Sequence, residues 1–254
     1  MTVEDESGPR VERSLPESGR MERVAPLIRR RIAPNGGPFT ATGTCTYVVG
    51  QDRVAIIDPG PDDPGHIAAL LDDLGPERVE AIVVTHTHRD HSPGARLLAA
   101  RTGAPIVGCG PHRAACALPE ADALFSGDHV MAWNTTIVAP PDGEMRAYMA
   151  SLEKLRGRTE TTYWPGHGGP VQEPARLVRC LIGHRRQREA AIRARLAAGD
   201  TRIPEVVAAI YQGLDPRLRG AAALSVFAHL EDLVGRGLVA CDGPPRLDAT
   251  YAPA

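Results

Sequence analysis

The chain has 254 residues, a formal net charge of -2 at pH 7, 43% hydrophobic residues and 24% charged residues. These values are typical of a globular protein and exclude a disordered chain, a collagen and a coiled coil. The near-zero net charge argues against a protein that mainly coats nucleic acid or an anionic membrane. No apolar stretch approaches the roughly 18 residues of a membrane span, so we expect no membrane partner.

The N-terminal residues 1–24 contain charged residues, serine and proline but no apolar core of a secretory signal. We therefore predict a flexible tail over this segment. The five cysteines are odd in number and form no Cys-x-x-Cys pair, which favours reduced thiols over a disulfide frame or a zinc ribbon. Both features predict a cytoplasmic location.

The segment after the tail begins with an apolar and basic run and then alternates between strands and helices. The hydrophobic pattern predicts strand, strand, helix, strand, helix and strand over residues 44–49, 54–58, 64–74, 79–84, 94–102 and 105–108. The first two strands flank a short turn and predict a hairpin. The alternation that follows it indicates an α/β domain.

The second half of the chain becomes helical. Strands are expected over 123–126 and 161–164, on either side of a helix over 141–155 that Asp142 would cap. Three helices and a short hairpin then follow over 174–198, 203–211, 217–236 and 238–247. This order is typical of a winged-helix domain. We therefore predict an α/β domain over residues 25–175 and a winged-helix-like domain over residues 176–254.

A cluster of histidine and aspartate follows the buried strand 79–84. His86, His88, Asp90 and His91 fall within six residues, and imidazole and carboxylate are ligands of zinc and related metals. Side chains two residues apart in an extended segment point the same way, so His86 and His88 can bind one ion while Asp90 and His91 turn toward a second. A solvated loop would explain a single histidine, but four ligand-type residues at this spacing favour a metal site.

Two further polar residues follow predicted strands, Asp128 in Ser-Gly-Asp-His and His167 in Pro-Gly-His-Gly. Polar residues at strand ends collect into sites in α/β proteins. Each alone is more often a turn residue, but beside the histidine-rich loop Asp128 could bridge two cations and His167 could complete the second. His129 adjoins Asp128, and neighbours on an extended segment point to opposite faces, so we do not expect it to bind.

These motifs resemble the metallo-β-lactamase superfamily, whose His-x-His-x-Asp-His motif is present here as residues 86–91. The stretches Phe-Ser-Gly-Asp-His and Pro-Gly-His-Gly and the winged-helix region are similar to the LACTB2-like hydrolases within it. The resemblance implies an αββα sandwich with the metals at one edge of the two sheets. It also implies one or two zinc ions per chain, held by His86, His88, Asp90, His91, Asp128 and His167.

The resemblance further implies a zinc-dependent hydrolase, in which a metal-bound water attacks a carbonyl or phosphorus centre. Asp90 would be the catalytic residue that orients this water or carries a proton. Some LACTB2-like proteins cut single-stranded RNA, so an RNA phosphodiester is the first substrate candidate. A small-molecule thioester, as in glyoxalase II relatives, is the second.

The winged-helix region has acidic residues, Glu231 and Asp232, beside its arginines. This favours a packing or dimerisation module, and so a homodimer, over a nucleic-acid-binding face. A DNA-binding regulator with a vestigial metal domain is the least favoured function, because the net charge gives no electrostatic footprint for DNA.

One ligand of the superfamily is missing, a further histidine between the first motif and the bridging aspartate. Between His91 and Asp128 the only histidine is His112, whose position fits the start of a surface helix better. The chain lacks a segment of several tens of residues that would supply this histidine and strands of the second sheet. We therefore expect an incomplete second sheet and weakened or asymmetric metal binding, with water or His112 in the third place. A catalytically impaired, non-enzymatic relative is the alternative function.

Overall fold

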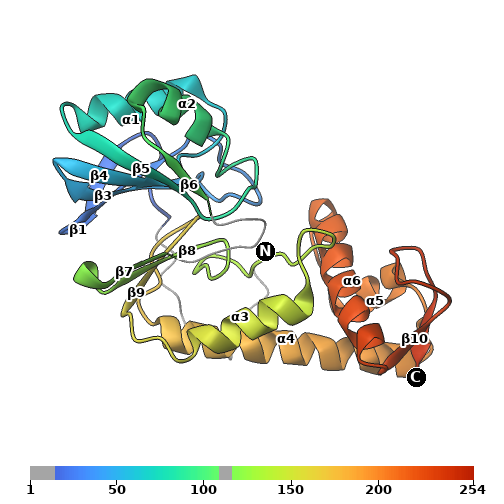
Figure 1. Ribbon diagram of the computed structural model, residues 1–254. Coiled ribbons are helices and arrows are strands. Elements are labelled where there is room, and N and C mark those ends of the chain that lie inside the picture. Colours follow the sequence, from blue (N-terminus) through green and yellow to red (C-terminus); the bar gives the residue numbers. More distant parts are fainter. Residues whose placement is uncertain (1–14, 109–115) are drawn as a thin grey trace. The chain divides into compact units, whose positions relative to one another are not determined.

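The computed structural model describes residues 15–108 and 116–254 (Figure 1). No helix in these ranges is long and apolar enough to cross a membrane. The chain divides into two compact units, Met1–Thr136 with Thr159–Leu177, and Ile137–Arg158 with Val178–Ala254.

The first unit contains a six-stranded sheet in the order β1-β2-β3-β4-β5-β6. Its strands are β1 (Met21–Ala25), β2 (Ile28–Ile32), β3 (Cys45–Gln51), β4 (Arg53–Ile57), β5 (Arg78–Val84) and β6 (Ile106–Gly108). Strands β1 to β4 pair antiparallel, which confirms the predicted hairpin for β3 and β4, whereas β4, β5 and β6 run parallel. Parallel neighbours need a long crossover, which α1 (Pro64–Leu74) and α2 (Gly94–Thr102) provide.

The two crossover helices begin and end where the sequence predicts. The Asp63 carboxylate accepts hydrogen bonds from the backbone N–H groups of Gly65 and His66, at 2.8 and 3.2 Å, and caps α1. Gly103 ends α2 in the left-handed conformation, at φ 71°. Apolar side chains of both helices, including Ile67 and Leu98, are fully buried in one cluster with side chains of β3, β4 and β5. This packing fixes the loop between β5 and α2, which carries the histidine-rich motif.

A second sheet of three strands lies in the same unit. Strand β8 (Ala123–Gly127) pairs antiparallel with β7 (Cys116–Leu118) and parallel with β9 (Thr162–Pro165). A second core cluster joins the two sheets through Ile28, Ile32, Cys45, Tyr47, Ile57, Ala123, Phe125 and Trp164. The described part of this sheet is therefore small, in agreement with the incomplete second sheet that the sequence predicts.

The second unit contains the helices α3 (Met145–Leu155), most of α4 (Pro174–Ala197), α5 (Ile203–Ile210) and α6 (Arg219–Gly235). Strands β10 (Val239–Cys241) and β11 (Tyr251–Pro253) pair antiparallel after α6. Buried side chains of α4, α5, α6 and both strands share one core that includes Ile192, Val206, Leu230 and Tyr251. The predicted mixed α/β class with a C-terminal winged-helix region is confirmed.

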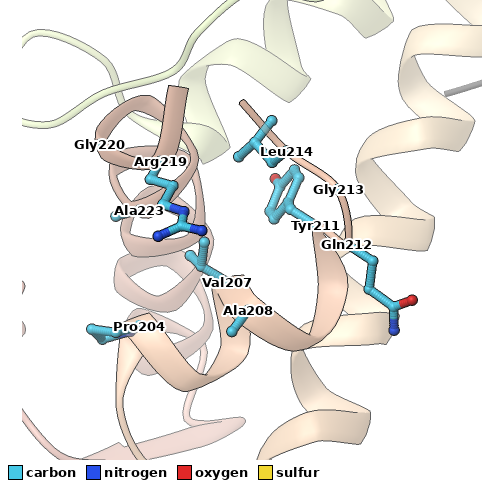
Figure 2. A pocket seen from close by; sticks show the side chains of 10 residues that line it. All are labelled: Pro204, Val207, Ala208, Tyr211, Gln212, Gly213, Leu214, Arg219, Gly220 and Ala223. Atoms are coloured by element: carbon cyan, nitrogen blue, oxygen red, sulfur yellow. The ribbon is translucent and has the colours of Figure 1, made fainter. Parts of the chain in front are cut away.

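A cavity of approximately 570 Å³ lies between α5 and α6 in this second unit (Figure 2). Its lining is mainly apolar, with Val207, Tyr211 and Leu214 among the side chains that form it. Gln212 and Arg219 supply its polar side chains. None of the predicted metal ligands lines this cavity.

Three predicted boundaries are wrong. The tail was expected to reach residue 24, but Met21–Ala25 is an edge strand of the first sheet, with Glu22 opposite Arg30 of β2. Charged residues on an exposed edge strand hide the alternation that predicts a strand. Helix α3 begins at Met145 and not at 141, so Asp142 does not cap it. The second strand of the terminal hairpin lies at Tyr251–Pro253, beyond the predicted 247.

Candidate metal centre

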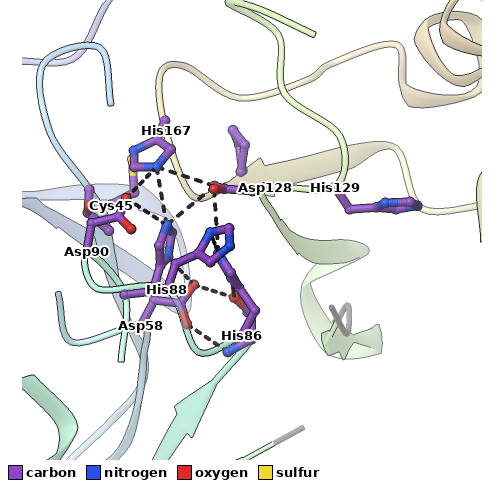
Figure 3. A network of polar contacts seen from close by, with 12 residues as sticks. Cys45, Asp58, His86, His88, Asp90, Asp128, His129 and His167 are labelled. Atoms are coloured by element: carbon purple, nitrogen blue, oxygen red, sulfur yellow. Dashed lines mark hydrogen bonds and ion pairs between the residues drawn. The ribbon is translucent and has the colours of Figure 1, made fainter. Parts of the chain in front are cut away.

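Four strand ends meet at one place in the first unit (Figure 3). Asp58 directly follows β4, and Asp128 directly follows β8. His86 and His167 each come two residues after the end of β5 and β9. The sheets are joined at this edge because the Cys45 N–H donates to the Gly166 carbonyl at 2.8 Å. Predicted ligands that are far apart along the chain therefore lie close together in space.

Four of the six predicted ligands form a compact group: Asp90, His91, Asp128 and His167. The Nε2 atoms of His91 and His167 are 3.2 Å apart, and each lies 3.4 Å from Asp128 Oδ1. Asp90 Oδ2 lies 3.3 Å from Nε2 of His91 and 3.1 Å from Nε2 of His167. Ligand atoms about 2.0–2.1 Å from a tetrahedral zinc ion are about 3.3 Å from one another. The spacing thus fits the ligand shell of such an ion.

The outer nitrogens of both imidazoles face hydrogen-bond acceptors. His91 Nδ1 is 2.9 Å from Asp58 Oδ2, and His167 Nδ1 is 3.2 Å from the Gly43 carbonyl oxygen. A neutral ring that donates from Nδ1 carries its lone pair on Nε2. Two imidazole lone pairs and two carboxylate oxygens then face one another, with both imidazoles buried and both carboxylates partly buried. Such a set of acceptors requires a positive charge between them.

The pKa shifts point to the same need for positive charge. Burial would lower the pKa of His91, but the carboxylates of Asp128 and Asp58 hold it well above its usual value. Burial would raise the pKa of Asp128, but His91 and a hydrogen bond with His86 hold it well below its usual value. Either a proton on His91 or a metal ion can supply the charge, so the two compete for this site.

A second group consists of His86, His88 and Asp128. His86 Nε2 is 3.0 Å from His88 Nδ1 and 3.5 Å from Asp128 Oδ2. Asp128 therefore turns Oδ2 toward this group and Oδ1 toward the first, which is the arrangement of a bridging carboxylate. Among the described residues this group has three members, one fewer than the first.

Asp58 is a site residue that the sequence analysis did not identify. Its buried carboxylate accepts hydrogen bonds from the Thr85 N–H at 2.8 Å and the Thr85 hydroxyl at 2.6 Å, besides facing His91. Through these hydrogen bonds Asp58 orients the His91 ring and holds Thr85 at the start of the histidine-rich loop. Its backbone adopts φ 47°, a strained value for a non-glycine residue. The signal in the sequence is Asp-Pro-Gly directly after a buried strand.

Gly166 is a second residue that only the structure identifies. A Cβ atom at this position would lie 2.5 Å from His91 Cε1 and 2.6 Å from Asp128 Oδ1. Real contacts are longer, so any larger residue would push against two of the four ligands. The glycine in Pro-Gly-His-Gly is required because the backbone passes directly against the site.

The structure brings all six predicted ligand residues into the first and second groups, and a third group of possible ligands combines Asp58 with His86 and His91. His129 points away from them, as expected for the neighbour of Asp128 (Figure 3). His112, the other candidate for the missing ligand, lies outside the described residues. Metal binding by the six residues stays a prediction.

Comparison with known proteins gives two family matches. Residues 40–117 match the profile of the Metallo-beta-lactamase superfamily, and residues 203–244 match that of the Beta-lactamase associated winged helix domain. Among solved structures, a beta-lactamase domain protein from Burkholderia ambifaria is similar over 95% of both chains, with a TM-score of 0.76 and 18% identity. At that identity the likeness supports the fold alone.

Curated relatives include proteins with two different names. A Beta-lactamase-like protein 2 homolog of Drosophila melanogaster is 27% identical over 85% of this chain and 90% of its own length. An Atrochrysone carboxyl ACP thioesterase of Aspergillus terreus is 26% identical over 89% of this chain and 85% of its own length.

These comparisons also bear on the missing segment. The alignment with the Drosophila protein spans 268 positions but takes in only 85% of a chain of 254 residues. The relative therefore has several tens of residues that this chain lacks. This agrees in size with the several tens of residues that the sequence analysis finds missing.

Proposed function

The chain carries a metallo-beta-lactamase superfamily domain and a beta-lactamase associated winged helix domain, and from this premise we propose that it is a zinc-dependent hydrolase. One observation carries the proposal. Four acceptor atoms of Asp90, His91, Asp128 and His167 converge at the spacing of a tetrahedral ligand shell. Nitrogen and oxygen donors in this geometry suit zinc.

In this proposal Asp90, His91, Asp128 and His167 hold one zinc ion, and His86, His88 and Asp128 hold another. Zinc, when bound, acidifies a coordinated water and polarises a carbonyl or phosphoryl oxygen. The first group has four protein ligands and the second has three among the described residues. We expect the first group to bind its ion more tightly.

Asp90 is the proposed catalytic residue. Its side chain is 26% exposed, whereas those of His91 and His167 are 0% and 1% exposed. Its carboxylate is therefore the part of the group most open to solvent, where it can accept a hydrogen bond from a water molecule and orient it toward a substrate. Hydrogen bonds with His167 and His91 outweigh burial and hold the pKa of Asp90 well below its usual value, so it stays an acceptor.

From the named relatives we place a thioester, the second candidate from the sequence, ahead of single-stranded RNA. Relatives from several fungi are named Atrochrysone carboxyl ACP thioesterases, and that of Aspergillus terreus aligns with 89% of this chain. Single-stranded RNA is the second candidate, supported by the resemblance to LACTB2-like hydrolases. The metal groups suit both, because each reaction directs water at an electrophilic centre whose oxygen gains negative charge.

The proposal is tested with zinc-loaded protein, a series of acyl-pantetheine thioesters and a fluorescently labelled single-stranded RNA. Hydrolysis of one class that is lost in His167→Ala and kept in Asp62→Ala supports it. Asp62 is a suitable control because its side chain is 57% exposed and belongs to no ligand group. Bound zinc without hydrolysis of either class would instead favour the non-enzymatic relative.

We also propose that the winged-helix region is a packing or dimerisation module. The boundary between it and the preceding domain is proposed near residue 175. Asp232 of α6 is engaged by Arg146 and Arg236, both at 3.0 Å, which supports a packing role for this acidic face. Light scattering of the whole chain tests for the homodimer. The described cysteines, Cys45, Cys116, Cys180 and Cys241, are free thiols, which supports the proposed cytoplasmic location.

A further inference from the structure

We propose that Arg30, held by Glu22, is a positioning residue for His167, acting through the loop of residues 165–168. The inference rests on the proposed metal site. It assigns a role to a buried cation on β2 and to a residue of the N-terminal edge strand, neither of which contacts the ligand atoms.

Side chains and backbone of β2 and β3 contact the loop 165–168 at three of its four residues, besides its backbone hydrogen bond to Gly127 of β8. The Tyr47 hydroxyl donates to the Pro165 carbonyl at 2.7 Å, and the Cys45 N–H donates to the Gly166 carbonyl at 2.8 Å. Arg30 Nη1 donates to the Gly168 carbonyl at 3.3 Å, on the other side of His167. The ligand is thus fixed from both directions along the chain.

Arg30 is placed for this contact by its partner on the neighbouring strand. The residue is 5% exposed, and its Nε donates to Glu22 Oε1 at 2.9 Å, with Nη2 contacting the same oxygen. Glu22 and Arg30 are opposite each other in the β1–β2 register. Burial opposes the charge on Arg30, but Tyr47, Cys45 and Glu22 offset it and raise the pKa of Arg30. A buried cation needs such compensation, and besides Glu22 the guanidinium of Arg30 donates to the loop carbonyl of Gly168.

His167 has little room to move without losing its geometry. Its Nε2 must stay within a narrow range of Asp90, Asp128 and His91, while its Nδ1 keeps the Gly43 carbonyl. Sites of this kind tolerate displacements of about 0.5 Å. Groups that orient a metal ligand without touching the metal change metal affinity by about 10- to 100-fold when they are replaced.

The test compares Arg30→Met with a matched control, Arg29→Met. Arg29 lies on the same strand and also pairs with a carboxylate, that of Glu77, but no contact with the loop 165–168 is recorded for it in the described chain. Zinc dissociation constants are measured on metal-free protein by competition with a chelating dye. The His167 imidazole resonances of metal-free protein are recorded by NMR.

We expect Arg30→Met to lower the affinity for the more tightly bound zinc ion by about 10- to 100-fold. Arg29→Met should change this affinity by less than about threefold. Arg30→Met should also shift the His167 resonances, whereas Arg29→Met should not. Glu22→Gln should give an intermediate effect and serves as the informative variant if Arg30→Met does not fold. A zinc affinity within about twofold of the parent, with unchanged His167 resonances, would overturn the proposal.

The two readouts separate this proposal from the proposed function. If the parent protein binds no zinc, the proposed hydrolase fails, yet the His167 resonances still decide whether Arg30 positions the ring. If zinc affinity falls equally in Arg29→Met and Arg30→Met, the effect is general destabilisation and the positioning role is rejected.

Discussion

His91 and His167 bring their Nε2 atoms to within 3.2 Å of each other, while the outer nitrogen of each ring faces an acceptor. Two neutral imidazoles arranged in this way repel each other, because lone pair faces lone pair. Asp90 and Asp128 add two carboxylate oxygens to the same space. The protein therefore gathers partly buried acceptors around a position whose charge a proton on His91 or a metal ion must balance.

Replacing the bridging carboxylate should affect both ions. We predict that Asp128→Ala loses most bound zinc, because Oδ1 faces the first group and Oδ2 the second. His88→Ala should lose only the weaker ion, since His88 belongs only to the second group. Elemental analysis after gel filtration checks both, with Asp62→Ala as the control. Zinc content in Asp128→Ala equal to that of the parent would exclude the bridging role.

The close approach at Gly166 gives a steric prediction. Gly166→Ala should lower the affinity for the more tightly bound zinc ion at least about tenfold, because the added Cβ would meet His91 and Asp128. The same contacts should destabilise the protein by about 1–3 kcal/mol. Gly183→Ala is the matched control. Gly183 lies within α4 with open space at its Cβ position, so this change should stabilise by about 0.5–1 kcal/mol. Thermal unfolding and zinc titration of both variants check the prediction, which fails if Gly166→Ala behaves like Gly183→Ala.

Zinc affinity should increase with pH. Because burial is outweighed by Asp128 and Asp58, the pKa of His91 is raised, and metal-free protein keeps a proton on this ring above its usual pKa of about 6.5. Zinc must displace that proton, so affinity should rise about tenfold per pH unit from pH ~6.5 up to the raised pKa. Competition titrations across this range check the slope. A flat profile would contradict competition between zinc and a proton on His91.

The raised pKa of His91 should make the stability of metal-free protein fall with increasing pH, whereas zinc affinity rises. A group whose folded pKa is raised stabilises the fold fully below its unfolded pKa, and this contribution is lost as pH rises through the folded pKa. Metal-free protein should therefore become less stable above pH ~6.5, whereas zinc-loaded protein should not. Melting temperatures of the two forms, measured side by side, check this difference. Parallel pH profiles would contradict it.

Asp58 should matter for metal binding although its oxygens are used within the protein. Asp58→Asn keeps the shape of the side chain but replaces an acceptor beside His91 Nδ1 with an amide that can donate to it. The His91 ring would then carry its proton on Nε2, the nitrogen that faces the metal position. We predict that zinc affinity falls by about 10- to 100-fold. Dye competition measures it, with the exposed Asp62→Asn as the control. Equal affinities in the two variants would mean that Asp58 does not set the His91 tautomer.

Much of the site follows from local sequence. His86, His88, Asp90 and His91 share the loop that follows β5, and Asp128 and His167 follow the ends of the parallel strands β8 and β9, so closeness within each of these two sets was predictable. Helix α1 was predictable for a similar reason, because Asp63 and Gly75 mark its two ends locally.

The rest depends on contacts between distant residues. Asp58 reads as the last residue of a strand until His91 packs against it. Gly166 matters because of the space left by Asp128 and His91, which no local pattern encodes. Strand β1 was missed because an edge strand with exposed Glu22 and Arg23 lacks apolar alternation, although its pairing with β2 is regular over most of its length.

The most direct test of the metal centre is a calorimetric titration of metal-free parent protein with zinc, repeated with His167→Ala. The account predicts two binding steps in the parent, a tight ion in the group of Asp90, His91, Asp128 and His167 and a weaker ion in the group of His86, His88 and Asp128. In His167→Ala the tight step should disappear and the weaker one should remain. Retention of the tight step in His167→Ala, at the affinity of the parent, would contradict the assignment of the metal centre.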